Sequence, residues 1–352
     1  MTKMNEVIYM RKIYILAIIF AIAGLTTFYY LNTVKFGNNS EVSFNKTPTP
    51  TVKPLLKYTY ENLQKYKPES SEIVIDEELE GEEDFVSHLF FFNTSGGKKV
   101  SGLLNIPSKK GEYPVVILFR GFVDPAIYET GIGSQRVGEY FASNGFITLA
   151  PDFLGYGSSD KPVDDAFEDR FMTYTTVIDL VSSIKNINAA FSDKEIYEIT
   201  ADYEKLAFWG HSNGGQIALS VAEITGHKYP TVVWAPVSKP FPYSILYYTD
   251  EFDDNGKALR RALAKFEENY DVEKYSPANF YDLIKAPIQI HQGVADEEVP
   301  VVWSDELEKI LKDKKVNVEY FTYPGENHNF QNGSWPLAVS RSAEFIKKNI
   351  GK

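Results

Sequence analysis

The sequence contains no cysteine among its 352 residues. This absence excludes a disulfide framework, a thiol nucleophile, a cysteine-ligated metal site and lipid attachment through an N-terminal cysteine, but it leaves the cellular compartment open. Positive charge is also scarce, because 36 Lys and Arg residues face 48 Asp and Glu residues and leave a net charge of −12. Such a chain repels phosphate groups, so we expect no nucleic-acid partner.

Long apolar runs are absent from the chain except for one near its N-terminus. Residues 13–34 carry no charged side chain, and IYILAIIFAIAGLTTFYYL would span about 28 Å as a helix, close to the hydrocarbon thickness of a bilayer. Arg11 and Lys12 precede this run, and Tyr29 and Tyr30 lie near its end, a pattern that favours an inside N-terminus. We therefore expect a single-pass membrane protein whose folded body lies outside the cytoplasm.

A cleaved signal peptide is the alternative, because the Ala-Ile-Ala at residues 21–23 resembles a small-residue cleavage site, and the protein would then be secreted. The segment TPTPTVKP follows, and its alternating proline is typical of an extended, semi-rigid spacer. The chain thus divides into a cytoplasmic stub with a membrane anchor or signal peptide (residues 1–35), a proline- and threonine-rich spacer (residues 36–57) and one folded domain (residues 58–352).

The body of the chain alternates short apolar runs with helix-like segments, as expected of an α/β domain with a mostly parallel sheet and helices on both faces. Buried parallel strands are predicted for PVVILF, FITLAP, LAFWG, TVVWAP, PIQIHQG and VEYFTYP. Before them, FVSHLFFFNT and VSGLLNIP flank the turn-rich SGGKK and predict a hairpin. Helices are expected over residues 133–145, 173–190, 215–225, 303–312 and 336–349.

The most informative motif is the G-x-S-x-G of WGHSNGG, at residues 209–215. It follows LAFWG and precedes the helix-like QIALSVAEI, which is the strand, turn and helix context that the motif requires in the α/β-hydrolase fold. Gly210 and Gly214 lack the Cβ atoms that would clash in so tight a turn, and the turn projects the Ser212 hydroxyl above the sheet. We therefore expect Ser212 to be a nucleophile.

A serine nucleophile needs a base, and the sequence offers five histidines. In this fold the catalytic residues follow the order serine, acid, histidine, with the histidine after the last strand. His328 meets this requirement, because it lies in the loop YPGENHNF after VEYFTYP. We interpret His291, at a strand end, as a packed structural histidine. The other three are placed less well: His88 lies in the hairpin, His211 lies beside the predicted nucleophile, and His227 precedes TVVWAP.

Asp296, in the turn that follows PIQIHQG, is the expected acid. Its task is to accept a hydrogen bond from the imidazole, fix its tautomer and stabilise the imidazolium that forms during attack. Glu297 and Glu298 are neighbouring alternatives, which we interpret as a solvated acidic turn.

An oxyanion intermediate needs donors that are fixed in advance, and two backbone amides can supply them. The amide of Asn213, directly after Ser212, is one expected donor, and the loop after PVVILF supplies the other, for which we choose Phe122. The same loop carries Arg120, which either binds a carboxylate of the substrate or forms a structural ion pair.

Together these segments resemble the catalytic domain of the prolyl oligopeptidase family, itself an α/β-hydrolase, from about Phe85 to the C-terminus. FASNGFITLAPDFLGYGSSD resembles the family's segment with an Asp-x-x-Gly-x-Gly turn, here Asp152, Gly155 and Gly157. The later landmarks follow in order: GHSNGG, WAPVS, YSPANFYDLIKAPIQIHQGVADEEVP and YPGENHNF. The resemblance implies a serine-type peptidase.

Three features depart from the family pattern. The oxyanion loop reads RGF where a histidine-glycine-glycine type is frequent, and HQG replaces the common HG turn. Fewer than about 90 residues precede the body, too few for the propeller domain of the large family members. These departures leave the catalytic residues in place but put strict oligopeptidase specificity in question.

The sequence therefore predicts hydrolysis of small peptides or esters through an acyl-enzyme, without a metal or organic cofactor. A carboxylesterase or acyl-carbohydrate esterase is an open alternative, because a fold does not identify its substrate. A noncatalytic, membrane-anchored binding protein on the same scaffold is another. The oligomeric state stays open.

Substrate choice is expected to reside in residues 239–283, an aromatic-rich insertion between WAPVS and PIQIHQG that would form a cap over the nucleophile. Tyr247, Tyr248 and Phe252 are the candidates for a pocket that takes an apolar acyl group or a proline-like ring, and packing of the cap onto the body is the alternative. The acidic TDEFDDNG within the insertion either binds a peptide's amino terminus or forms a solvated turn.

Overall fold

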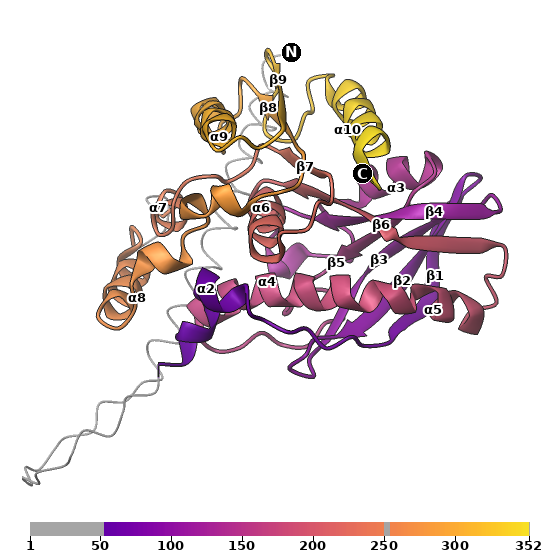
Figure 1. Cartoon of the computed structure of the whole chain (residues 1–352), viewed down its shortest axis with the longest axis horizontal. Coiled ribbons are helices and arrows are strands. Elements are labelled where there is room, and N and C mark those ends of the chain that lie inside the picture. Colours follow the sequence, from indigo (N-terminus) through magenta and orange to yellow (C-terminus); the bar gives the residue numbers. More distant parts are fainter. Residues whose placement is uncertain (1–52, 250–253, 352) are drawn as a thin grey trace, which may run out of the picture.

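The computed structural model describes residues 53–249 and 254–351 (Figure 1). The predicted membrane span at residues 13–34 and the pocket candidate Phe252 lie outside the described residues. Within the described ranges, no helix combines the length and the apolar character needed to cross a membrane.

Nine strands of the described chain form one sheet in the order β1-β2-β3-β5-β4-β6-β7-β8-β9. Neighbours from β1 to β5 along this order pair antiparallel, and every pair from β5 through β4 to β9 is parallel. The strands are β1 (Ile73–Glu82), β2 (Phe85–Asn93), β3 (Lys99–Pro107), β4 (Gly111–Phe119), β5 (Ile147–Pro151), β6 (Ile199–His211), β7 (Thr231–Trp234), β8 (Ile288–Gly293) and β9 (Val318–Tyr323). This mostly parallel mixed sheet confirms the predicted α/β-hydrolase architecture.

Helices cover both faces of the sheet (Figure 1), because the parallel strands carry apolar side chains on each side. The helices α3 and α10 pack on one face, while α4, α5 and α6 pack on the other. The helices are α2 (Tyr60–Leu63), α3 (Gln135–Ser143), α4 (Ala166–Ser183), α5 (Ile187–Asp193), α6 (Asn213–Thr225), α7 (Tyr243–Leu246), α8 (Lys257–Glu267), α9 (Val301–Asp313) and α10 (Trp335–Asn349).

The start of α4 differs from the prediction of a helix over residues 173–190. The helix begins seven residues earlier, at Ala166, because the Asp165 carboxylate caps it by accepting hydrogen bonds from the amides of Phe167 and Glu168. A charged first turn hides this start from a search for apolar periodicity. The helix ends at Ser183, and a short 3-10 turn leads into α5.

A 3-10 helix, η1 (Pro54–Tyr58), covers the end of the predicted spacer and the first residue of the predicted domain, and it packs on the cap insertion. Leu55 is buried; its amide donates to the Tyr270 hydroxyl at 3.3 Å, and its carbonyl accepts from the Tyr275 hydroxyl at 3.1 Å. The adjoining α2 continues this contact, because the Tyr60 ring stacks on Phe280 with centroids 4.3 Å apart. The N-terminal part of the described chain thus braces the cap.

The cap insertion, residues 239–283, consists of α7, α8 and three 3-10 turns, η4 (Val272–Tyr275), η5 (Pro277–Asn279) and η6 (Tyr281–Leu283), apart from the four residues outside the description. Most of its aromatic rings serve packing. Phe241 and Phe266 lie against Phe171 of α4 with centroids 5.6 and 6.1 Å away. These rings fix the cap on the body rather than line a pocket.

The core also holds an acid, Glu223 on α6, which is 1% exposed and has no hydrogen-bond partner among the described residues. Burial raises the pKa of Glu223 well above its ordinary value, so the native state keeps its proton. In the unfolded chain, Glu223 releases its proton above about pH 4.3. Between that pH and the higher pKa of the native state, the free energy of unfolding therefore falls as pH rises, by about 1.4 kcal/mol per pH unit.

Glu223→Gln is therefore expected to stabilise the protein more at pH 7 than at pH 4.5. Urea unfolding at the two pH values measures this difference, and Glu344→Gln on the exposed face of α10 is the matched control. An equal change in the free energy of unfolding at both pH values would contradict a native state that holds the proton.

Candidate active site

The turn between β6 and α6 has the geometry that a nucleophile elbow requires. Ser212 adopts φ 57° and ψ −121°, a strained conformation for a residue with a side chain. A Cβ at Gly214 would lie 1.9 Å from the carbonyl oxygen of Phe119, and one at Gly210 would lie 2.3 Å from the carbonyl oxygen of Gly214. Both positions therefore require glycine, as predicted.

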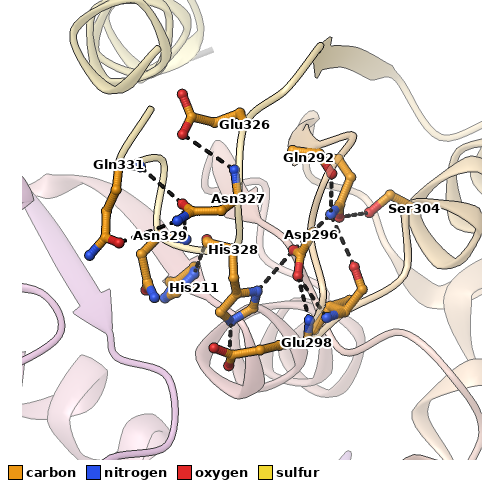
Figure 2. Close-up of polar contacts among 12 residues, drawn as sticks. His211, Gln292, Asp296, Glu298, Ser304, Glu326, Asn327, His328, Asn329 and Gln331 are labelled. Atoms are coloured by element: carbon orange, nitrogen blue, oxygen red, sulfur yellow. Dashed lines mark hydrogen bonds and ion pairs between the residues drawn. The ribbon is translucent and has the colours of Figure 1, made fainter. Parts of the chain in front are cut away.

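His328 and Asp296 form a buried pair at the ends of β9 and β8 (Figure 2). The Nδ1 of His328 lies 2.9 Å from Oδ2 of Asp296, and their side chains are only 6% and 0% exposed. Burial alone would raise the pKa of Asp296, but hydrogen bonds from His328 and from the amides of Glu298 and Val299 hold it below its ordinary value. The charged carboxylate thereby places the imidazole proton on Nδ1 and leaves Nε2 as the basic nitrogen.

His211 connects this pair to the elbow. Its ring lies 4.5 Å from the His328 ring, and its Nε2 is 3.0 Å from the His328 carbonyl oxygen. Burial lowers the pKa of His211 to about 3, so a neutral ring donates this hydrogen bond. The residue next to Ser212 thus holds the backbone of His328. The Ser212 hydroxyl itself makes no hydrogen bond with the part of the chain that the structure describes.

Glu298 lies beside the other nitrogen of the imidazole. Its Oε2 is 3.6 Å from Nε2 of His328, and its side chain is 64% exposed. A carboxylate with this exposure is weakly held and can turn away at little cost. The geometry therefore separates two acids, since a buried one faces Nδ1 and a solvated one faces Nε2.

Glu326 organises the loop that carries His328, a role that sequence reasoning missed. It is 1% exposed and accepts hydrogen bonds from the amides of Asn332 and Ser334 at 2.5 and 2.7 Å. Burial would raise the pKa of Glu326, but these amide donors hold it below its ordinary value. The charged side chain closes the loop, and its own carbonyl accepts from the amide of Ala295, beside the predicted acid.

Gln292, the departure in the HQG turn, supports Asp296 directly. Its Nε2 donates to Oδ2 of Asp296 at 2.9 Å and to the carbonyl of Val299 at 3.2 Å, while its Oε1 accepts from the Ser304 hydroxyl at 2.7 Å (Figure 2). The side chain is fully buried. Gln292 therefore fixes the oxygen of Asp296 that faces the imidazole.

Gln292→Leu is expected to lower kcat by about 10- to 100-fold with a small change in KM, because a hydrogen bond to a charged group contributes about 1.5–3 kcal/mol. Steady-state hydrolysis measures this effect. Gln289→Leu is the matched control, since Gln289 lies three residues earlier on β8 and bonds Glu319 and His291 instead. An equal loss in both variants would mean that the strand, and not the contact with Asp296, matters.

The two expected oxyanion donors lie at the start of α6 and in the loop after β4, which meet at Ser212. A Cβ at Gly121 would be only 3.0 Å from the Ser212 Cβ, which places the loop after β4 against the elbow. The amides of Phe122 and Asn213 donate to no described residue, so both are available for a ligand. The Phe122 side chain is 61% exposed.

Arg120 braces the loop that carries Phe122. It is 6% exposed; Nη1 donates to the Gly121 carbonyl at 3.0 Å and Nη2 to the Asp152 carbonyl at 2.9 Å. Its guanidinium stacks on Tyr156 at 3.9 Å. The role is structural, as one reading of the sequence proposed, but the partners are backbone carbonyls and rings rather than a carboxylate.

Tyr247 and Tyr248 gather around Trp303 near the pair of His328 and Asp296. Tyr247 lies 4.8 Å from the Trp303 ring and 5.1 Å from the Tyr248 ring. The Tyr248 hydroxyl is buried without a partner among the described residues. This aromatic group comes from the residues that directly follow α7 and from α9, and it lies near Asp296. The third candidate, Phe252, is outside the described residues.

Comparisons with known proteins place this geometry in context. Residues 135–352 match the model of the prolyl oligopeptidase family. Over 243 residues the chain is 27% identical to the uncharacterized peptidase YtmA of Bacillus subtilis (strain 168), covering 67% of this chain and 84% of that protein.

Solved structures share the fold. An acetyl xylan esterase from Paenibacillus sp. R4 superposes with a TM-score of 0.57 at 15% identity, covering 86% of this chain and 96% of its own. Dipeptidyl peptidase 4 of Porphyromonas gingivalis gives a TM-score of 0.52 at 16% identity, covering 76% of this chain and 36% of its own. At such identities these structures are similar in fold alone, and one fold here accommodates both an esterase and a peptidase.

Proposed function

Because the chain belongs to the prolyl oligopeptidase family, we propose that it is a serine hydrolase in which Ser212 attacks a carbonyl carbon, His328 is the general base and Asp296 orients the histidine. The family match over residues 135–352 includes all three positions. The observation that carries the proposal is the buried 2.9 Å contact between His328 and Asp296, joined through His211 to a serine in a strained turn.

The proposed reaction follows from these contacts. Nε2 of His328 takes the Ser212 proton as Oγ bonds to the carbonyl carbon, and the amides of Asn213 and Phe122 stabilise the oxyanion. Nε2 then returns the proton to the leaving group as its bond to carbon breaks. A water molecule, deprotonated by the same nitrogen, hydrolyses the acyl-enzyme and restores the Ser212 hydroxyl.

The bond that is hydrolysed is a peptide or an ester bond, and family membership favours the peptide. The aromatic group of Tyr247, Tyr248 and Trp303 supports an apolar or proline-like ring beside the reaction centre. A carboxylesterase is the second candidate, favoured by the fold shared with the acetyl xylan esterase.

Labelling with a fluorophosphonate, followed by kinetics on matched aryl esters and aminoacyl arylamides, tests the proposal. Labelling with cleavage of arylamides supports a peptidase, and labelling with cleavage of esters alone supports the esterase. Failure to label or to cleave either series would overturn the proposal in favour of a noncatalytic binding protein.

We also propose that residues 13–34 hold the hydrolase at the outer face of a membrane, on the basis of their uncharged composition. The full chain is expected to pellet with membranes and to resist alkaline extraction, whereas a chain that begins at Lys53 should be soluble and active. A soluble protein with its N-terminus near Gly24 would indicate a cleaved signal peptide instead.

A further inference from the structure

A cavity of about 210 Å³ adjoins the proposed reaction centre. It lies between α4, α6 and the loops that follow β4 and β5, and its wall includes Asn213 and Phe122, which carry the expected oxyanion donors. A substrate held by those amides therefore has this space beside its carbonyl group. The wall is not simply apolar, because it also includes Arg170, Asp169 and Gln216.

Arg170 is a cation that is held by a neutral side chain rather than by an ion pair. Its Nη2 donates to the neutral Oε1 of Gln216 at 2.6 Å, and within the described residues it forms no ion pair with a carboxylate. Gln216 is 3% exposed and lies one turn after Asn213 on α6, so it fixes the guanidinium on the same wall as the oxyanion donors. A guanidinium has five N–H donors, so most of them are available to a ligand.

Asp169 shares the cavity but leaves the charge of Arg170 uncompensated. Its carboxylate accepts no hydrogen bond from the described residues. Burial raises the pKa of Asp169 to about 6, and only Lys98 acts in the opposite direction. A guanidinium paired with this carboxylate would lower that pKa instead. Arg120 on the same wall adds further positive charge.

We propose that Arg170 binds a carboxylate of the substrate, so that the enzyme prefers substrates with an anionic group near the carbonyl that is attacked. The inference rests on the proposed hydrolase function and names a substrate class for it. A planar, forked guanidinium held by one neutral hydrogen bond suits bidentate binding of a carboxylate. That carboxylate belongs to the acyl part or to the leaving group, as in a half-ester of a dicarboxylic acid or in a peptide's carboxyl terminus.

Two matched ester pairs distinguish these sources. The acyl pair is the p-nitrophenyl half-ester of glutarate and p-nitrophenyl valerate, and the leaving-group pair is 4-acetoxybenzoate and 4-acetoxybenzamide. In at least one pair, we expect the anionic member to have a kcat/KM about 10-fold or more above that of its neutral partner. Arg170→Gln should lower kcat/KM for that anionic member by about 10- to 100-fold and should change kcat/KM for its neutral partner little.

Two further variants test the charge argument. Arg136→Gln removes the same charge from α3, where Arg136 stacks on Trp335 outside the cavity, and should leave the preference unchanged. Asp169→Asn removes the repelling charge and should strengthen the preference. If the unaltered protein prefers neither anionic member, or if Arg170→Gln lowers both members of a pair equally, the inference is wrong. Continued turnover of the neutral esters with fluorophosphonate labelling would then leave the hydrolase function standing, whereas absent labelling would overturn both.

Discussion

Ser212→Ala is expected to reduce hydrolysis by about 10⁴- to 10⁶-fold and to abolish fluorophosphonate labelling. The Ser212 hydroxyl is the group that forms the acyl-enzyme. Ser212 is the single residue between the end of β6 and the start of α6. Residual hydrolysis would come from the oxyanion donors acting on a bound substrate with water as the nucleophile.

The substitution should leave the fold intact, which makes the result interpretable. Ser212 precedes α6 without a side-chain hydrogen bond to its first turn, so removal of the hydroxyl costs no helix cap. Ser220→Ala on the same helix is the matched control, because Ser220 is fully buried and its hydroxyl has no partner among the described residues. Normal turnover by the Ser212 variant, with circular dichroism unchanged, would defeat the assignment.

Sequence reasoning found the elbow because its requirements are local. The two glycines at Gly210 and Gly214 are needed for contacts within a few residues of the turn or with the strand beside it. His328 and Asp296 were identified by their order along the chain, since parallel strands end at one edge of the sheet and bring distant loops together there. Most strands were found for a similar reason, because buried parallel strands appear as short apolar runs.

The supporting contacts of the site escaped prediction because they join residues whose sequence context carries no signal. Gln292 looked like a departure from a turn pattern, and only the fold shows its amide on Asp296. Glu326 is a lone acid in a glycine- and asparagine-rich loop, and its amide donors come from six and eight residues later. Such pairings depend on how loops close, which periodicity does not describe.

The edge strand β1 was missed for a different reason. Half of the residues in its sequence, IVIDEELEGE, are acidic, and Val74 is 51% exposed. An edge strand needs no continuous apolar run, because only part of its surface packs against the core and charge protects its free edge. Two register shifts against β2 further obscure the alternation of apolar and polar residues.

Asp296→Asn is expected to lower kcat by about 10⁴-fold while the protein stays folded. An amide in place of the carboxylate presents an N–H toward Nδ1 of His328 and favours the tautomer with its proton on Nε2, which then cannot accept the Ser212 proton. The loss of charge also removes the stabilisation of the imidazolium that forms during attack. The asparagine oxygen can still accept hydrogen bonds from the amides of Glu298 and Val299, so the turn should persist.

Two acid variants separate this role from the general effect of charge. Asp305→Asn alters an acid that accepts a hydrogen bond from the Tyr320 hydroxyl at 2.7 Å in an exposed position, and turnover should change little. Glu298→Gln alters the carboxylate near Nε2, and because that side chain is 64% exposed, activity should stay within a few-fold of normal. A different result would be a loss of turnover by orders of magnitude in Glu298→Gln but not in Asp296→Asn. The two nitrogens of His328 would then exchange roles, so that Nδ1 is the base and Nε2 is the nitrogen held by a carboxylate. The acid that orients His328 would then be the solvated one, and the buried contact at 2.9 Å would belong to a resting state.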